Sequence, residues 1–167
     1  MIKNVQKDLQ ETVCFTGHRR LQMTEEELRE KTRELIWKAI KQGYTHFVCG
    51  GALGFDMIAA EQVCWIKCDW DNEIMRPITL ELAIPCKDHM AKWPARQIPR
   101  LERIKEMADR IVYVSIKEYN RMCMKNRNRY MVLKSALVIA YYEGEPGGTK
   151  QTIDFADEHG REIWYIK

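Results

Sequence analysis

The sequence predicts an α/β protein with three layers, in which a mostly parallel sheet of about six strands lies between two layers of helices. Short apolar runs alternate with helical patterns along the chain, as in a parallel sheet with right-handed crossovers. The run at 136–142 is apolar throughout, which is typical of a strand buried on both faces. Segments that contain glycine follow three apolar runs, at 17–20, 49–56 and 143–149. The carboxyl ends of parallel strands meet at one edge, where such sheets bind ligands.

The first half of the chain contains two strand–helix units. The β-branched and aromatic run at 12–16 is the first strand. Thr24 and Glu27 form a capping-box pattern that begins a helix, and Gly43 is suited to end it. A buried strand follows at 44–48, and a helical pattern at 57–67.

The second half continues the alternation. We expect strands at 78–85, 110–115, 136–142 and 162–166, and helices at 98–108, from about 125, and from a Thr149 cap to His159 with Gly160 as its stop. Because the pattern is unbroken, we expect one domain over residues 1–167 with a polar extension at 1–11.

Composition indicates an ordinary globular protein. Hydrophobic residues make up 46% of the chain and charged residues 31%. The net charge of +3 is too small to argue for nucleic acid as a partner. No apolar run approaches the roughly 20 residues of a membrane span, and residues 1–10 have no apolar core typical of a signal peptide. We therefore expect a cytoplasmic protein without membrane contact.

The six cysteines are expected to be reduced and buried, since they lie in strand-like and helical runs. A metal site would require Cys-x-x-Cys pairs or clustered histidines. The nearest approach to such a pattern is Cys86, Asp88 and His89, where packing is the simpler interpretation. No metal site is predicted.

The segment 49–56 lies between a predicted strand and a predicted helix. Its three glycines permit backbone torsions that a Cβ would forbid and leave peptide N–H groups bare at a helix N-terminus. This predicts a phosphate contact through the backbone at Gly50, Gly51, Ala52 and Gly54. The alternative is a tight turn whose glycines serve packing alone.

Two other strand ends have related chemistry. Thr16, Gly17, His18 and Arg19 end the first strand and form a second candidate anion site, although a solvated basic turn would have the same sequence. His18 would either bind a phosphate or cap the turn. The third candidate is the backbone at Gly147, Gly148 and Thr149.

Asp56 lies in the first turn of the helix that follows the second strand. There it would complement the helix dipole or cap the helix. In a functional role it would accept hydrogen bonds from ribose hydroxyls or assist attack on a glycosidic carbon. A carboxylate repels a phosphate, so a sugar or base contact fits it better.

The motifs at 16–19, 50–61, 127–131 and 147–149, in this order and spacing, resemble the SLOG superfamily and, within it, the YpsA-like branch of uncharacterised bacterial and prophage proteins. The resemblance covers about 12–166. It implies a Rossmann-like fold and the binding of a nucleotide or nucleotide-derived ligand, such as a derivative of NAD or ADP-ribose, as a sensor or regulatory module. No cofactor is required for this role.

The LOG-type phosphoribohydrolases are relatives whose comparison suggests an alternative, an N-glycosidase that acts on a nucleoside monophosphate. Arg127 falls where their arginine would lie, and Asp154 occupies the position of their glutamate by spacing. Because Asp is one methylene shorter, its carboxylate would be displaced by about 1 Å, which can cost on the order of a hundredfold in rate. The catalytic candidates of such an enzyme are Asp56, Arg127 and Asp154.

DNA-processing protein A, another relative, suggests a third function, the binding of single-stranded nucleic acid. Such binding uses a basic groove interleaved with aromatic rings. The residues that could contribute are Arg19, Arg20, Arg127, Arg129 and Tyr130. The modest net charge argues against it, so the expected partner is a small-molecule nucleotide. Relatives of this fold often pair through helices, which makes a homodimer a further expectation.

Overall fold

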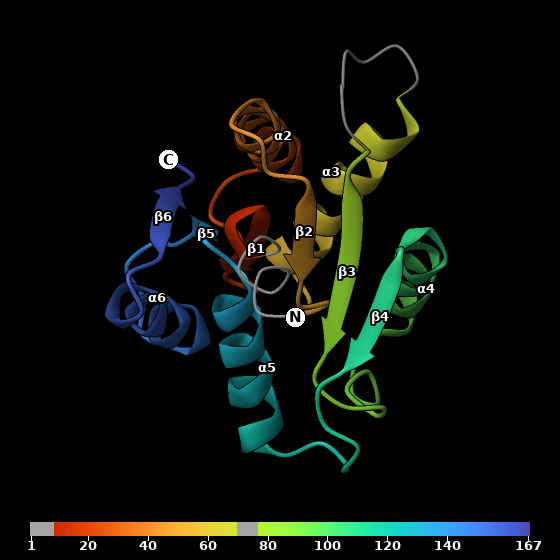
Figure 1. The fold of residues 1–167 in the computed structure, drawn as a ribbon. Coiled ribbons are helices and arrows are strands. Elements are labelled where there is room, and N and C mark those ends of the chain that lie inside the picture. Colours follow the sequence, from red (N-terminus) through yellow and green to blue (C-terminus); the bar gives the residue numbers. More distant parts are fainter. Residues whose placement is uncertain (1–8, 70–76) are drawn as a thin grey trace, which may run out of the picture.

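The computed structural model describes residues 9–69 and 77–167. In this part of the chain, six parallel strands form one sheet in the order β4-β3-β2-β1-β5-β6 (Figure 1). The strands are β1 (Thr12–Gly17), β2 (His46–Cys49), β3 (Thr79–Ile84), β4 (Arg110–Tyr113), β5 (Leu137–Tyr141) and β6 (Glu162–Tyr165). The helices are α2 (Glu25–Lys41), α3 (Phe55–Cys68), α4 (Ile98–Met107), α5 (Arg121–Lys134) and α6 (Gly148–Glu158), with a short 3-10 helix, η1 (Ala95–Gln97), before α4.

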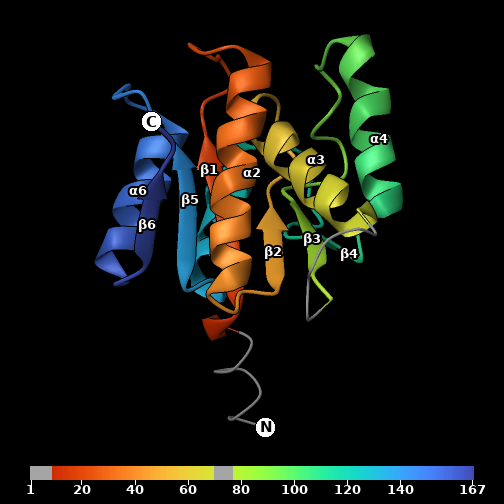
Figure 2. The same cartoon turned by 90° about the horizontal axis from the view of Figure 1, so that it is seen from above.

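Two layers of helices cover the sheet. Helices α2, α3 and α4 pack side by side on one face, and α5 and α6 pack on the other (Figures 1 and 2). Strand β1 shows how the sequence makes both faces apolar, because Val13 and Phe15 join the core under α2 and α3 while Cys14 joins the core under α5 and α6. The predicted three-layer α/β/α fold is confirmed. Over the described residues, no helix has both the length and the apolar character needed to cross a membrane.

Helix termini follow the sequence signals in most places. The Thr24 hydroxyl accepts a hydrogen bond from the Glu27 N–H at 3.2 Å, and so caps α2 as predicted. The carboxylate of Glu27 pairs with Lys31 at 3.6 Å. Gly43, with φ of +98°, follows the helix as its expected stop, and Gly160, with φ of +64°, does the same after α6.

Two helix starts differ from the prediction. Helix α6 begins at Gly148 with Gly147 as its N-cap, so Thr149 lies inside the first turn and does not cap it. The φ of +145° at Gly147 explains this, because only glycine adopts that conformation readily. Helix α5 begins four residues before the predicted start, since Asn120 caps it by accepting a hydrogen bond from the Cys123 N–H at 2.9 Å.

Glu81 is a charged residue in the core that the strand pattern did not single out. It lies on β3, is fully buried, and accepts hydrogen bonds from the Tyr130 hydroxyl at 2.7 Å and from Lys134 Nζ at 3.1 Å. His46 Nε2 lies 3.5 Å away and Arg110 3.7 Å away. Burial raises the pKa of Glu81, but hydrogen bonds from His46, Tyr130 and Lys134 outweigh burial and lower the pKa to about 2.

The low pKa of Glu81 predicts acid-sensitive stability. The pKa is lower in the folded chain, so its contribution is complete above the ordinary value of 4.5 and is lost as pH falls from there towards about 2. A shift of this size corresponds to about 3 kcal/mol. We expect Glu81→Gln to lower the free energy of unfolding by about 3 kcal/mol at pH 7, and by progressively less as pH falls below 4.5.

Urea denaturation of wild type and Glu81→Gln at several pH values measures this loss. Glu30→Gln, which changes an exposed glutamate, is the matched control and should shift the free energy of unfolding by less than about 0.5 kcal/mol. A destabilisation of Glu81→Gln that is the same at pH 7 and pH 3 would contradict the assignment.

Candidate functional site

The candidate site lies where β1 and β5 end. The chain moves from β1 outward through β2 and β3 to β4 and then returns to place β5 on the other side of β1, so the strand order reverses between these two strands. Adjacent crossovers at such a point leave a crevice at the carboxyl ends of the strands. A hollow of about 380 Å³ occupies this position. The predicted site residues that line it are Thr16, Gly17, His18, Arg19, Ala52, Asp56, Arg127, Gly147, Gly148 and Thr149.

Two buried charges of opposite sign lie in this hollow. The exposed fraction is 3% for Arg127, from α5, and 6% for Asp56, from the first turn of α3. Arg127 Nη1 lies 4.0 Å from Asp56 Oδ2 and donates a hydrogen bond to the carbonyl of Gly50. Arg127 Nε donates to Asn128 Oδ1 at 2.8 Å, and the Ala52 N–H donates to Asp56 Oδ2 at 3.4 Å.

The two charges depend on each other. Burial raises the pKa of Asp56, and the charge of Arg127, the Ala52 N–H and the charge of Arg19 oppose that rise. Burial lowers the pKa of Arg127, and the carboxylate of Asp56 opposes that fall. A lone charge in this position would be expensive, so each side chain favours the charged form of the other.

The glycines at the ends of β1 and β2 allow neighbouring segments to pack directly against the backbone. A Cβ on Gly50 would lie 2.6 Å from Asp56 Oδ2 and against the Arg127 guanidinium. One on Gly54 would lie 2.5 Å from the backbone of Arg19, and one on Gly17 would lie 2.7 Å from Phe55 Cβ. These positions leave no room for a side chain. Gly50 and Gly54 are absent from the lining of the hollow.

Gly51 also lies outside the hollow. Its φ is +62°, and a Cβ there would meet Ile84 Cδ1 at 2.8 Å. Of the predicted phosphate-binding segment at 50–54, Ala52 alone among the four named residues reaches the hollow. Gly50, Gly51 and Gly54, which were predicted to contact a phosphate, therefore lie outside this hollow, in a turn that packs against Arg127, Asp56 and the residues after β1.

The start of α6 is open. Gly147 has no side-chain cap, and a Cβ on Gly147 or Gly148 would meet no atom within 4 Å. The first turn of α6 contains no acidic residue. The N–H groups of such a turn and the helix dipole favour an anion. Arg19 also lines the hollow and is exposed.

His18 lies between the β1 end and β5. Its ring stacks on Tyr142, with 5.4 Å between ring centroids. Its Nε2 is buried and has no hydrogen-bond partner among the described residues. Its carbonyl accepts a hydrogen bond from the Phe55 N–H at 3.2 Å, which occupies the N-terminus of α3. Buried polar atoms are usually paired, so Nε2 is a candidate contact for a ligand.

Asp154 lies apart from the other two catalytic candidates. Its side chain is exposed and pairs with Lys150, one turn earlier on α6. It lines a different hollow of about 270 Å³ between α5 and α6, together with Lys125 and Arg129. Spacing from Gly148 placed it at the glutamate position of the hydrolases, but Asp154 does not line the hollow that contains Asp56 and Arg127.

Some lining residues were not predicted. Phe15, Met124, Asn128 and Pro146 also line the hollow. Asn128 follows Arg127 in the segment 125–131, whose polar side chains were expected to reach a cleft, although Asn128 was not named as a site residue. In the described part of the chain, no group of three or more His, Cys, Asp or Glu residues could hold a metal ion.

Solved structures with low sequence identity share the fold. DNA processing protein A from Helicobacter pylori, whose structure concerns single-stranded DNA binding, aligns with a TM-score of 0.64 and 20% identity, over 99% of this chain and 68% of that one. DNA processing protein A from Streptococcus pneumoniae aligns with a TM-score of 0.66 and 16% identity, over 97% and 51%. The Moco carrier protein from Chlamydomonas reinhardtii aligns with a TM-score of 0.54 and 14% identity, over 94% and 76%. These likenesses concern the fold alone.

Sequence comparison identifies the family. The uncharacterized SPbeta prophage-derived protein YoqJ of Bacillus subtilis (strain 168) is 29% identical, over 83% of this chain and 86% of that protein. The model of the YspA SLOG family, YpsA, matches residues 13–167. This match includes the whole sheet except Thr12, the first residue of β1, and every residue of the hollow at the ends of β1 and β5. The chain therefore belongs to the YpsA SLOG family.

Proposed function

We propose that the hollow binds a nucleotide or nucleotide-derived ligand, with a phosphate at the start of α6 and a sugar near Asp56. The observation that carries this proposal is the presence, in one hollow, of an open helix N-terminus and a buried Arg127–Asp56 pair. A volume of about 380 Å³ is within the range of small-molecule sites. Membership of a SLOG family agrees with a nucleotide-type ligand.

The phosphate would contact the first turn of α6. The N–H groups of Gly148 and Thr149 belong to the unpaired set at the start of a helix, and the open space at Gly148 gives a ligand access. Arg19, which lines the same hollow, would add a charge-assisted hydrogen bond. Thr16, near the end of β1, also lines the hollow.

The sugar would contact Asp56. Its carboxylate receives one long hydrogen bond, from Ala52 at 3.4 Å, and has acceptor capacity left for ribose hydroxyls. Arg127, 4.0 Å away, favours the ionised form of that carboxylate. The unpartnered Nε2 of His18 supplies a further polar contact within the hollow. Ligand recognition of this kind requires no metal and no bond cleavage, which fits a sensor or regulatory module.

We predict that Gly148→Asp removes AMP binding without loss of stability. An acidic residue in the first turn stabilises a helix by about 0.3–1 kcal/mol, and no atom lies within 4 Å of the new Cβ. The same carboxylate would repel a phosphate at that position. Isothermal titration calorimetry with AMP and ADP-ribose, together with thermal denaturation, measures both effects.

Gly148→Ala is the matched control, because it adds the Cβ without the charge. It should bind within about threefold of wild type, whereas Gly148→Asp should bind at least about fiftyfold more weakly. Equal affinities of Gly148→Asp and wild type would show that the phosphate lies elsewhere. If wild type binds none of the nucleotides tested, the proposed function is wrong.

A second candidate function is hydrolysis of the N-glycosidic bond of a nucleoside monophosphate. The observation that favours it is the buried Asp56, whose pKa is raised by burial, as catalytic carboxylates often are. If the protein is such a hydrolase, the wild type should release adenine from AMP. Asp56→Asn should abolish this release, and Asp154→Asn should not. If the protein binds AMP but all of the AMP is recovered intact after incubation, this function is excluded.

Binding of single-stranded nucleic acid gains less support. Arg127 is buried against Asp56, and the Tyr130 hydroxyl donates to Glu81 on the sheet face. Arg20 is exposed but does not line the hollow. These predicted residues therefore do not form a continuous basic and aromatic groove of the kind that binds single-stranded nucleic acid.

A further inference from the structure

Two buried thiols face each other beside the candidate site. Cys86 follows the end of β3, and Cys123 lies in the first turn of α5. Their Sγ atoms are 3.6 Å apart, and their exposed fractions are 0% and 1%. Both cysteines are reduced in the structure. The pair is a short movement away from bonding distance, because a disulfide needs an S–S distance of about 2.05 Å.

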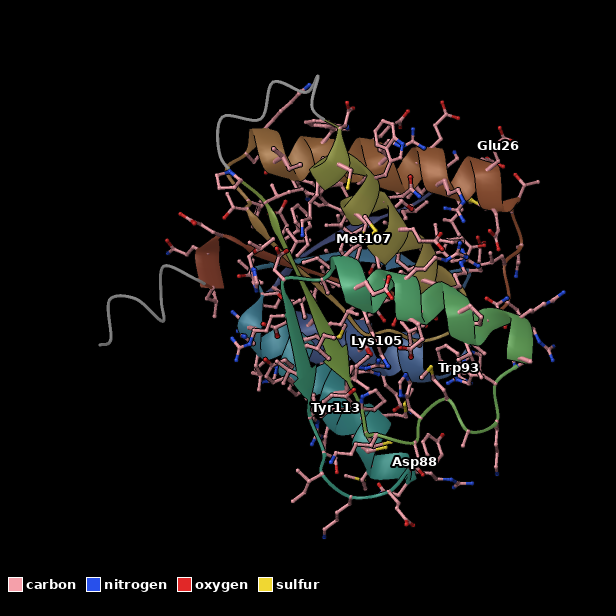
Figure 3. The ribbon with its side chains drawn as sticks, turned by 90° about the vertical axis from the view of Figure 1, so that its right-hand side faces the viewer. Glu26, Asp88, Trp93, Lys105, Met107 and Tyr113 are labelled. Carbon is pink, nitrogen blue, oxygen red and sulfur yellow. The ribbon has the colours of Figure 1, made fainter. Side chains whose placement is uncertain are left out.

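Cys123 is part of the cap of α5. The Asn120 N–H donates to its Sγ at 3.4 Å, and its own S–H donates to the Asn120 carbonyl at 2.9 Å. The segment before the helix is also tied to the segment after β3, since the Tyr119 N–H donates to Asp88 Oδ1 at 2.8 Å. Figure 3 shows Asp88 beside this end of α5. The thiol pair therefore spans a junction that fixes where α5 begins.

The same turn of α5 leads into the candidate site. Met124 follows Cys123 directly. Arg127 lies four residues after Cys123 and therefore on the same face of the helix as Cys123. Met124 and Arg127 both line the hollow. Arg127 contacts the Gly50 carbonyl and Asp56, so a displacement of the α5 start changes the position of its guanidinium.

We propose that Cys86 and Cys123 form a reversible disulfide that alters ligand binding in the adjacent hollow. The oxidant is a low-molecular-weight disulfide such as glutathione disulfide. The effect on binding rests on the proposed function, whereas the disulfide itself does not. Its formation removes the S–H donor to the Asn120 carbonyl and draws the first turn of α5 towards the end of β3.

The exchange proceeds in two balanced steps. The Cys123 thiolate attacks one sulfur of glutathione disulfide, the glutathione S–S bond breaks, and one glutathione leaves as a thiolate that takes up a proton. The Cys86 thiolate then attacks Cys123 Sγ in the mixed disulfide, and the second glutathione leaves in the same way. Two protein thiols are oxidised and one glutathione disulfide is reduced to two thiols.

Access to the pair requires local opening. Burial raises the pKa of Cys86 to about 12, so this thiol stays protonated while the turn is closed. The preceding segment at 116–120 is exposed and has no regular structure, which favours opening of the first turn of α5. We therefore expect slow formation, over minutes to hours, and a stable product once the turn closes again.

The test uses the full chain with Cys68→Ser, which removes an exposed thiol that would form mixed disulfides. The protein is equilibrated in glutathione buffers from fully reduced to fully oxidised. Intact mass should fall by about 2 Da, the mass of two hydrogens, and peptide mapping should find Cys86 joined to Cys123. Dithiothreitol should restore the original mass. Adding Cys86→Ala or Cys123→Ser should abolish the change, while adding Cys64→Ala should not.

Titration with AMP then tests the link to the hollow. We expect the oxidised form to bind AMP at least about tenfold more weakly than the reduced form, since displacements near 1 Å can cost up to a hundredfold. Absence of the Cys86–Cys123 peptide in fully oxidising buffer overturns the disulfide, whatever AMP does. If the disulfide forms but the oxidised and reduced proteins bind AMP with equal affinity, the regulatory role of the disulfide is overturned. A disulfide in a protein that binds AMP in neither form leaves the redox pair standing and refutes the proposed function.

Discussion

The buried pairing of Arg127 with Asp56 is the interaction on which the arrangement of the site depends. It joins α5 on one face of the sheet to the first turn of α3 at the end of β2, and Gly50 permits this because it has no Cβ in their way. Loss of one partner from such a pair typically costs about 3–5 kcal/mol, since the remaining charge stays buried. The pair is therefore a structural tie across the sheet edge as well as the candidate contact for a sugar.

The two helix N-termini at this edge have different roles. That of α3 is occupied, because the His18 carbonyl accepts from the Phe55 N–H and the turn at Gly54 packs on Arg19. That of α6 is uncapped and faces open space. An anion gains most where N–H groups lack partners, so the difference gives the hollow one end suited to phosphate and another suited to hydroxyl groups. This polarity is the physical argument for the proposed nucleotide-type ligand.

The face under α5 has a second set of buried polar contacts. Glu81 binds Tyr130 and Lys134 on this helix, and Cys123 meets Cys86 at its start. These contacts hold α5 on the sheet at both ends, and Arg127 lies between them. The placement of α5 on the sheet therefore sets the contact between Arg127 and Asp56. For this reason, a covalent change at Cys123 would alter the geometry of the hollow.

The sequence by itself determined the fold class, the alternation of strands and helices, the Thr24 cap and the family, because these depend on local periodicity, capping chemistry and motif order. It also named most residues of the hollow, since the carboxyl ends of parallel strands must meet at one edge. The sequence could not show which glycines have free space beside them. Gly54 and Gly148 both precede or begin a helix, but the backbone of Arg19 packs against Gly54, whereas a Cβ on Gly148 would meet no atom within 4 Å. Nor could spacing show that Asp154 pairs with Lys150 outside the hollow, that Glu81 is buried, or that Cys86 and Cys123 lie side by side. Those outcomes were decided by tertiary structure, because they depend on contacts between segments far apart in the chain.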